Sequence, residues 1–361
     1  MMDGRHVGQL PGVMSWSYET EWCDEGNLKF ELTPRALSLN SGMEYTPDYH
    51  SVLRKWATIV TIEDDTTGSV DAAGPVKDVQ WDGSKLTVTC GDGWSLWDKR
   101  LVLNHALADK WVNGNILIDE DNPAPEWHLR LNGKTYEDIA YQLVNESLKW
   151  GAAPYMVPEA DTTATVTREY FCWDFATVLD RLQDLTEVDN GAVLNFRPLV
   201  TNGVFSWQMG GAQALGSNHW RFMVGSPDVR FELKSLKDTA EDMVTQAFGV
   251  GGKTDDHTMV AMHSVVPPNG IPVLQSVNKD HDTTTEVETL VEYLTEDTNR
   301  GGETQNSVEV HVGKDLPVMA GDLMTVTLDD AWLGVRTYDF KVLEVSDGSS
   351  ETFKTVGLRE A

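Results

Sequence analysis

The sequence is poor in positive charge, has few cysteines and lacks a long apolar run. Its 361 residues include 28 Lys and Arg against 57 Asp and Glu, so the formal net charge is −29. A chain this acidic repels phosphate backbones and anionic lipid, which argues against non-specific DNA binding and against adsorption to such membranes. No run of 18 apolar residues occurs, and the N-terminal residues contain no apolar signal core. We therefore expect a soluble chain without a membrane span or a targeting signal.

Three cysteines are present, Cys23, Cys90 and Cys172, and they lie far apart in the sequence. An odd number of dispersed thiols excludes a disulfide framework or a four-thiolate zinc site within one chain. We expect free, mostly buried thiols from a reducing cytoplasm. Tryptophan, by contrast, is abundant, with 13 residues spread from Trp16 to Trp332. We interpret these as core and interface anchors, with a sugar-stacking surface as the alternative.

Residues 1–102 carry the alternating pattern of antiparallel strands. In segment 15–32, apolar side chains alternate on both sides of a break at residues 24–26, which predicts a hairpin with one buried face. Further strands are expected at 58–62, a β-branched run, and at 85–90, after an Asp-Gly turn. This first unit should be a small antiparallel barrel or sandwich.

Residues 103–216 combine helical and strand patterns. Thr135, with Asp138 three residues later, predicts the start of a helix that ends before Gly151. A second helix is expected to begin at Asp174 and to place one apolar face inward, formed by Phe175, Val178, Leu179, Leu182 and Leu185. The strand pattern returns over 192–207, with a hairpin turn at 201–203.

Residues 217–361 also mix both types of element. A helix is expected over 286–296, within a helical insertion at about 255–302. Alternating apolar residues predict the final strands at 308–312, 324–328, 338–342 and 353–358. Strand-rich ends around a helical middle indicate an α+β, mainly β fold.

The segment from Ala247 to Thr254, AFGVGGKT, matches the phosphate-binding P-loop pattern except at its first position. In a P-loop, backbone N–H groups and the lysine (here Lys253) hold phosphates, and the hydroxyl of the last residue (here Thr254) binds magnesium. Asp329, which follows an apolar run, would be the acidic residue that also binds the magnesium ion. A P-loop must open a helix, however, whereas two acids at 255–256 and two prolines at 267–268 follow here. We therefore expect 249–254 to be a structural loop between strands, and we expect no nucleotide cofactor.

Cys172 is the candidate for nucleophilic chemistry. It precedes a predicted helix, whose N-terminus would lower the pKa of the thiol, and His219, His257 or His263 could serve as its base. The alternative is an inert thiol buried among the aromatic residues of 170–173, and we favour it because free cysteines are usually buried.

No complete metal or hydrolase motif is present. None of the nine histidines is followed by Glu, and G-x-S-x-G is missing. Asp119 and Asp121 resemble the start of a calcium loop, but prolines interrupt it and Arg130 occupies the position of the chelating Glu. A glycosidase carboxylate pair cannot be singled out among 57 acids. We therefore assign no catalytic, cofactor-binding or metal-binding residue, and we expect a non-enzymatic protein.

Short segments in a fixed order form a further pattern. A tryptophan-containing strand (16–18) and an acidic-Gly hairpin (25–32) come first, followed by a Gly-x-x-x-Leu segment that ends in Arg (91–100). Two helices (134–144 and 174–185), a hairpin (196–207) and a segment that ends in a Gly-Asp step (316–322) come after them. This order resembles the tail-tip hub proteins of siphophages that infect actinobacteria, a family related to the baseplate hub of contractile phages.

The resemblance implies two tail-tube-like β-barrel domains, at 1–102 and 217–361, with the α/β residues 103–216 as a peripheral domain. It also implies a homotrimeric ring around the DNA channel at the virion tail tip, assembled in the host cytoplasm. Implied partners are the distal tail protein and tail tube, the tape-measure protein and other tail-tip or receptor-binding proteins; DNA would pass through without specific binding. Two alternatives stay open: a tail-associated cell-wall hydrolase that uses Cys172 or a carboxylate pair, and a Trp-rich carbohydrate-binding adhesin.

Overall fold

The computed structural model describes most of the chain. The residues outside the description are 1–3, 5–7, 35–36, 39–43, 46–47, 65–67, 112–114, 117, 119–122, 161–163, 165, 190, 212–217, 227–229, 242, 255–256, 268–269, 282–283, 285, 303–304, 331–333 and 361.

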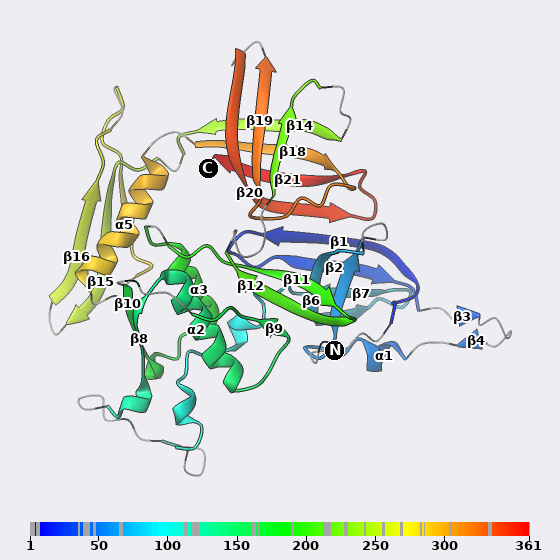
Figure 1. The fold of residues 1–361 in the computed structure, drawn as a ribbon, viewed down its shortest axis with the longest axis horizontal. Helices are drawn as coiled ribbons and strands as arrows, with labels where there is room; N and C mark the ends of the chain where they lie inside the picture. The colour runs from blue at the N-terminus through cyan, green and yellow to red at the C-terminus, as the bar shows by residue number, and fades with distance from the viewer. Residues whose placement is uncertain are drawn as a thin grey trace.

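One large sheet joins the two ends of the chain (Figure 1). Among the described residues it has eleven strands, with the order β14-β18-β21-β20-β1-β2-β7-β6-β5 along its main path; β19 pairs with β20, and β13 pairs with β19. From the first hundred residues it takes β1 (Val13–Glu21), β2 (Asn27–Leu32), β5 (Ile59–Glu63), β6 (Val70–Trp81) and β7 (Leu86–Cys90). From the last third it takes β13 (His219–Met223), β14 (Phe231–Thr239), β18 (Gln305–Gly313), β19 (Leu323–Asp330), β20 (Gly334–Gly348) and β21 (Phe353–Glu360).

The N-terminal and C-terminal strands share one hydrophobic core. β1 pairs antiparallel with β20, with Tyr18 opposite Asp347. Tyr18 and Phe30 from the N-terminal strands are buried in the same cluster as Val310 and Phe340 from the C-terminal strands. The inward-facing side chains of both sets of strands therefore form a common core, although the first set ends at Cys90 and the second begins at His219.

The middle of the chain packs two helices beside two small sheets. α2 (Tyr136–Lys149) begins at Thr135, whose hydroxyl accepts a hydrogen bond from the Asp138 N–H at 3.1 Å. α3 (Val178–Thr186) packs against α2, and buried leucines from both helices meet Trp94 and Trp97 in a second core. The sheets are β11 (Asn195–Thr201), β12 (Val204–Gly210) and β9 (Tyr155–Met156), and β8 (His128–Lys134) with β10 (Val166–Phe171).

A third unit stands beside the large sheet in Figure 1. β15 (Gln246–Thr254) lies between β16 (His257–Ser264) and β17 (Gln275–Asn278), and α5 (Val287–Gly301) covers one face of this sheet. The remaining elements are short: β3 (Leu37–Ser38), β4 (Glu44–Tyr45), α1 (Tyr49–Val52), and the 3-10 turns η1 (Trp97–Lys99), η2 (His105–Leu107), η3 (Pro125–Trp127) and η4 (Cys172–Asp174). No helix in the described ranges is long and apolar enough to cross a membrane.

The start of α3 corrects the sequence prediction. The helix begins at Val178, not at Asp174, because Phe175 has a left-handed backbone conformation with φ of 49° that interrupts the chain there. Thr177 and Asp180 instead form a capping box, and Phe175 is 48% exposed rather than on the inner face. α5 begins at the expected place but continues past Glu296 to Gly301.

The mainly β character expected from the sequence is confirmed. In the described part of the chain the large sheet does not close into a barrel. The two-barrel architecture and the boundaries at 102 and 216 stay predictions.

Candidate functional site

The segment that resembles a P-loop is a β-strand. Residues 246–254 form β15, which pairs antiparallel with β16 and is followed by that strand rather than by a helix. The Gly252 N–H donates to the Thr284 carbonyl at 2.7 Å, so it is not free for phosphate. Asp329 lies in β19 of a different sheet. The expected loop at 249–254 is therefore wrong in detail, since the segment is itself a strand with a bulge.

The glycines of β15 have a packing role. A Cβ at Gly249 would lie 2.9 Å from a Leu290 methyl, and a Cβ at Gly251 would lie 2.7 Å from the Thr284 carbonyl oxygen. Glycine at these positions lets α5 approach the sheet closely. The pattern that suggested phosphate binding thus arises from close helix–sheet contact.

Cys172 is a buried thiol. It lies in η4 and packs with Leu107 and Trp127, and its sulfur accepts a hydrogen bond from the Asn104 N–H at 3.3 Å. Burial raises the pKa of the Cys172 thiol, which is the opposite of the expected helix effect. The nearest helix, α3, begins six residues later, so its N-terminus does not act on this sulfur.

The candidate histidines do not join Cys172. His219 lies on β13 and pairs with the Thr325 hydroxyl at 2.7 Å, while His263 lies on β16 and pairs with the Thr298 hydroxyl at 2.7 Å. His257 begins β16, in the same small sheet. Asp119 and Asp121 lie outside the described residues, and the Arg130 guanidinium is paired with Glu169 at 2.8 Å. In the part of the chain that is described, no group of three or more His, Cys, Asp or Glu side chains is arranged to hold a metal ion.

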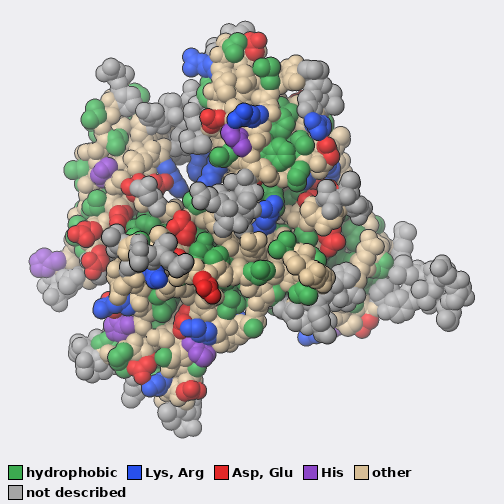
Figure 2. Space-filling view, in the orientation of Figure 1, with side chains coloured by type: hydrophobic (Ala, Val, Ile, Leu, Met, Phe, Trp, Pro, Cys, Tyr) green, Lys and Arg blue, Asp and Glu red, His purple; other side chains and the backbone are tan. Residues whose placement is uncertain are grey.

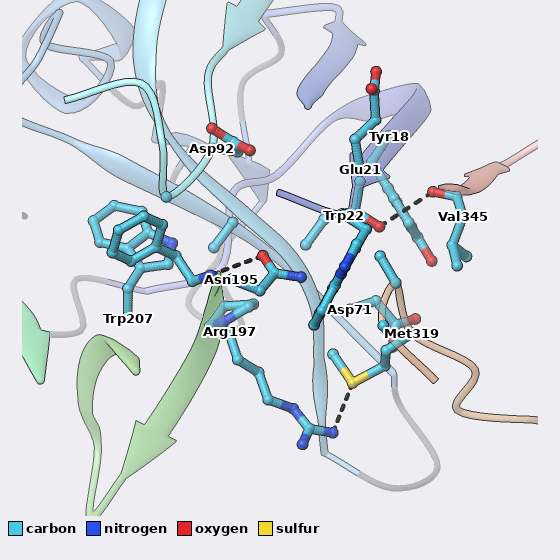
Figure 3. A pocket seen from close by; sticks show the side chains of 18 of the residues that line it. Tyr18, Glu21, Trp22, Asp71, Asp92, Asn195, Arg197, Trp207, Met319 and Val345 are labelled. Atoms are coloured by element: carbon cyan, nitrogen blue, oxygen red, sulfur yellow. Dashed lines mark hydrogen bonds between the residues drawn. The ribbon is translucent and has the colours of Figure 1, made fainter. Parts of the chain in front are cut away.

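A small pocket lies where three distant parts of the chain meet (Figure 3). Its volume is about 70 Å³, room for a few waters. Figure 3 shows the indoles of Trp207 and Trp22 on opposite sides, with the Arg197 side chain reaching the Met319 sulfur. The lining residues come from β1 and the residue after it, from β6, from the turn after β7, from β11 and β12, from the segment before β19 and from β20. Among them are Tyr18, Trp22, Asp71, Asp92, Phe196, Trp207, Gly321, Asp322 and Val345.

The Gly321–Asp322 step organises one wall of this pocket. Gly321 has φ of 95°, and a Cβ there would collide with the Trp22 ring, so glycine is required. The buried Asp322 carboxylate accepts hydrogen bonds from Asn218 N–H at 2.8 Å, Trp220 Nε1 at 2.7 Å and Met319 N–H at 3.1 Å. These bonds fix the entry to β19 against β13, while Gly321 packs against Trp22, the residue after β1. The sequence pointed to this Gly-Asp step only through the family resemblance.

The turn after β7 forms the opposite wall. The Asp92 carboxylate accepts from Gly26 N–H at 2.8 Å, Trp94 N–H at 2.9 Å and Ser95 N–H at 3.2 Å. Burial raises the pKa of Asp92 to about 7, although these hydrogen bonds oppose the shift. Beside it, Trp94 meets Phe196 edge to face at 4.8 Å between ring centroids. Sequence reasoning noted this segment but not the titratable carboxyl inside it.

The pocket is therefore a joint rather than a reaction centre. Four acids line it, Glu21, Asp71, Asp92 and Asp322. Asp92 and Asp322 already hold backbone and indole donors of their own chain, and Asp71 accepts a hydrogen bond from the Lys354 ammonium at 3.5 Å. A space of about 70 Å³ is far below the 300 Å³ or more typical of small-molecule sites. What the arrangement does is fix the N-terminal strands, the middle hairpin and the C-terminal strands to one another.

The fold is similar to those of two solved tail proteins. One is the tail protein from Neisseria meningitidis MC58, with a TM-score of 0.51 and 10% identity over 97% of this chain and 92% of that protein. The other is the 43 kDa tail protein of prophage MuSo2 from Shewanella oneidensis, with a TM-score of 0.50 and 13% identity over 97% and 94%. No protein-family model matches the sequence, and no curated protein matches it. The chain has the fold of these tail proteins over nearly its whole length, as the sequence resemblance predicted.

Proposed function

We propose that the protein is a structural component of a phage tail, the tail-tip or baseplate hub that joins the tail tube to the tip proteins. The observation that carries this proposal is the similarity of the fold to those of two tail proteins, which covers 97% of this chain and more than nine-tenths of each tail protein. The order of short segments along the sequence supports the hub position in particular.

In this proposal three copies form a closed ring around the DNA channel. The domains at 1–102 and 217–361 would form the ring, with 103–216 outside it. The distal tail protein and tail tube would bind one face, and the tape-measure and receptor-binding proteins would bind near the other. The net charge of −29 supports a channel through which DNA passes without adhering.

The same proposal describes a non-enzymatic protein. The buried thiol of Cys172, with its raised pKa, does not favour the hydrolase alternative. The adhesin alternative needs clustered exposed indoles. Trp94, Trp97, Trp127 and Trp207 are buried, and the two exposed indoles among the described residues, Trp81 on β6 and Trp111 after η2, make no ring contact with each other. Neither alternative gains support from a specific contact in the described chain.

Co-expression with the tail proteins encoded beside it tests the hub role. We expect the protein to co-purify with the distal tail and tape-measure proteins, and we expect a cryo-EM map of tails to show it at the tip with three-fold symmetry. Localisation elsewhere on the virion would refute the hub role.

A separate assay tests the non-enzymatic role. We expect the purified protein to release no peptidoglycan fragments. Release that is abolished by Cys172→Ala would refute this part of the proposal.

A further inference from the structure

The unit formed by β15, β16, β17 and α5, called the α5 unit below, has a small core of its own. Ala247 and Ala261 of the sheet pack with Leu290 and Leu294 of α5 in a cluster that is separate from the two larger cores. α5 packs chiefly on β15 and β16, and it lies between this small sheet and α3 (Figure 1). A unit with its own core can keep its fold while its contacts with the rest of the chain change.

Two adjacent residues of α5 contact the helical middle of the chain. The Glu292 carboxylate accepts hydrogen bonds from the Tyr136 hydroxyl of α2 at 2.9 Å and from the Arg168 guanidinium of β10 at 3.0 Å. Tyr293 is 6% exposed and is buried in the core that contains Leu182 of α3. These two residues therefore dock the α5 unit on α2, α3 and β10.

His281 is part of the same contact. Its imidazole stacks on the Tyr293 ring, with the centroids 3.5 Å apart and the planes 9° apart, and the residue is only 7% exposed. Among the described residues, the imidazole nitrogens have no hydrogen-bond partner. Burial lowers the pKa of His281, so the docked unit favours the neutral ring.

Five titratable or charged side chains surround His281, from α3, from α5 and from the preceding position: Arg181, Asp184, Asp280, Tyr293 and Asp297. The three acids raise the pKa of His281 against the effect of burial, whereas Arg181, which pairs with Asp184 at 2.7 Å, lowers it. Figure 2 shows Asp and Glu side chains gathered on the surface over α5 and α3. An imidazolium is thus unfavourable while it is buried against Tyr293, and it gains water beside these acids once the contact opens.

We propose that His281 and Tyr293 form a pH-sensitive latch, which holds the α5 unit on the middle of the chain and opens when His281 is protonated. A released His281 has its ordinary pKa of 6.5, whereas the pKa of the docked residue is lower. Docking is therefore strongest above pH 6.5, and it weakens as the pH falls from there towards the lowered pKa. Because one proton is involved, the docking equilibrium changes by at most about tenfold per pH unit. The latch is independent of the tail role and can be tested on the isolated chain.

Hydroxyl-radical footprinting of Tyr293, read by mass spectrometry, measures the release of the α5 unit, because oxidation requires an exposed ring. At low salt we expect oxidation of Tyr293 to rise severalfold from pH 7.5 to pH 5, whereas Tyr18, buried in the core of the large sheet, should stay protected. His281→Phe keeps an aromatic stack that cannot be protonated, so its Tyr293 should stay protected at pH 5. His257→Phe is the matched control, because His257 is an exposed histidine of the same unit; it should keep the pH response of the natural chain.

A second neutral variant, His281→Gln, separates the charge of the ring from its packing. Its docking may be weaker than in the natural chain at pH 7.5, but oxidation of its Tyr293 should not change with pH. An equal pH response in His281→Phe or His281→Gln would overturn the latch, because an acid such as Glu292 would then be the titrating group. Unchanged oxidation of Tyr293 in the natural chain would also overturn it, as would a parallel rise at Tyr18, which would mean that the whole chain unfolds.

Discussion

At the scale of single residues, the buried carboxyl of Asp92 gives the protein a pH-dependent stability. Its pKa is about 7 in the folded chain and near 4 when unfolded, so the folded chain holds the proton more tightly. The contribution to folding is fully present below pH 4 and is lost as pH rises through 7. It amounts to a few kcal/mol, on the order of 4, because each pKa unit corresponds to about 1.4 kcal/mol.

We expect Asp92→Asn to remove this pH dependence. Asparagine stays neutral, so the difference in unfolding free energy between natural chain and variant should change by about 4 kcal/mol from pH 4 to pH 8. Urea unfolding at several pH values measures this, with Asp98→Asn as the control for loss of a carboxyl, because Asp98 is only half-buried. A difference that is constant with pH would show that Asp92 does not titrate in this range.

At the scale of elements, helix starts were predictable where a single capping signal was present. Thr135 and Asp138 gave the start of α2 correctly, because capping is a contact between residues three apart. For α3 the predicted start at Asp174 was wrong. The left-handed conformation of Phe175 moves the start to Val178, and it arises where a 3-10 turn is held by its packing, which a local pattern does not encode.

The cap of α3 has a measurable energetic role. The Thr177 hydroxyl accepts from the Asp180 N–H at 3.0 Å, and the Asp180 carboxylate accepts from the Thr177 N–H at 3.3 Å. We expect Thr177→Ala to destabilise the protein by about 1 kcal/mol and Thr177→Ser to have little effect. Asp174→Ala should cost less than Thr177→Ala in the same urea titrations. The reverse order would place the helix start at Asp174 after all.

The glycine-rich strand β15 allows a test between packing and phosphate binding. Gly251→Ala should destabilise by about 1–3 kcal/mol, because the new methyl group meets the Thr284 carbonyl oxygen. Lys253 is exposed, so Lys253→Ala should change the unfolding free energy by no more than about 0.5 kcal/mol. Denaturant unfolding of the two variants measures both effects. Nucleotide-dependent stabilisation that is lost in Lys253→Ala would contradict the packing explanation.

At the scale of the whole molecule, the sheet that joins the two ends could not be read from the sequence. Each strand was visible in its own alternation, but the pairing of Tyr18 with Asp347 connects residues from opposite ends of the chain. Register between strands so distant depends on the shape of the assembled core rather than on local pattern. The pocket of Figure 3 was unpredictable for the same reason, since its walls come from seven separate segments.

The proposed ring makes a prediction about salt that follows from charge and symmetry. Three copies of a chain with net charge −29 bring a formal −87 together, and this repulsion opposes closure unless apolar contacts or screening outweigh it. The Debye length falls from about 30 Å at 0.01 M salt to about 8 Å at 0.15 M. We therefore expect the isolated protein to be monomeric at low salt and to shift towards a trimer as salt or magnesium rises.

Sedimentation velocity across a salt series measures this directly. Magnesium should act at lower concentration than sodium, because a divalent cation screens acidic surfaces more strongly. Sodium chloride at the same ionic strength is the control that separates screening from specific magnesium binding. A stable dimer would contradict the three-fold ring. An assembly that weakens as salt rises would also contradict it, because screening of the repulsion between the acidic subunits should favour the ring.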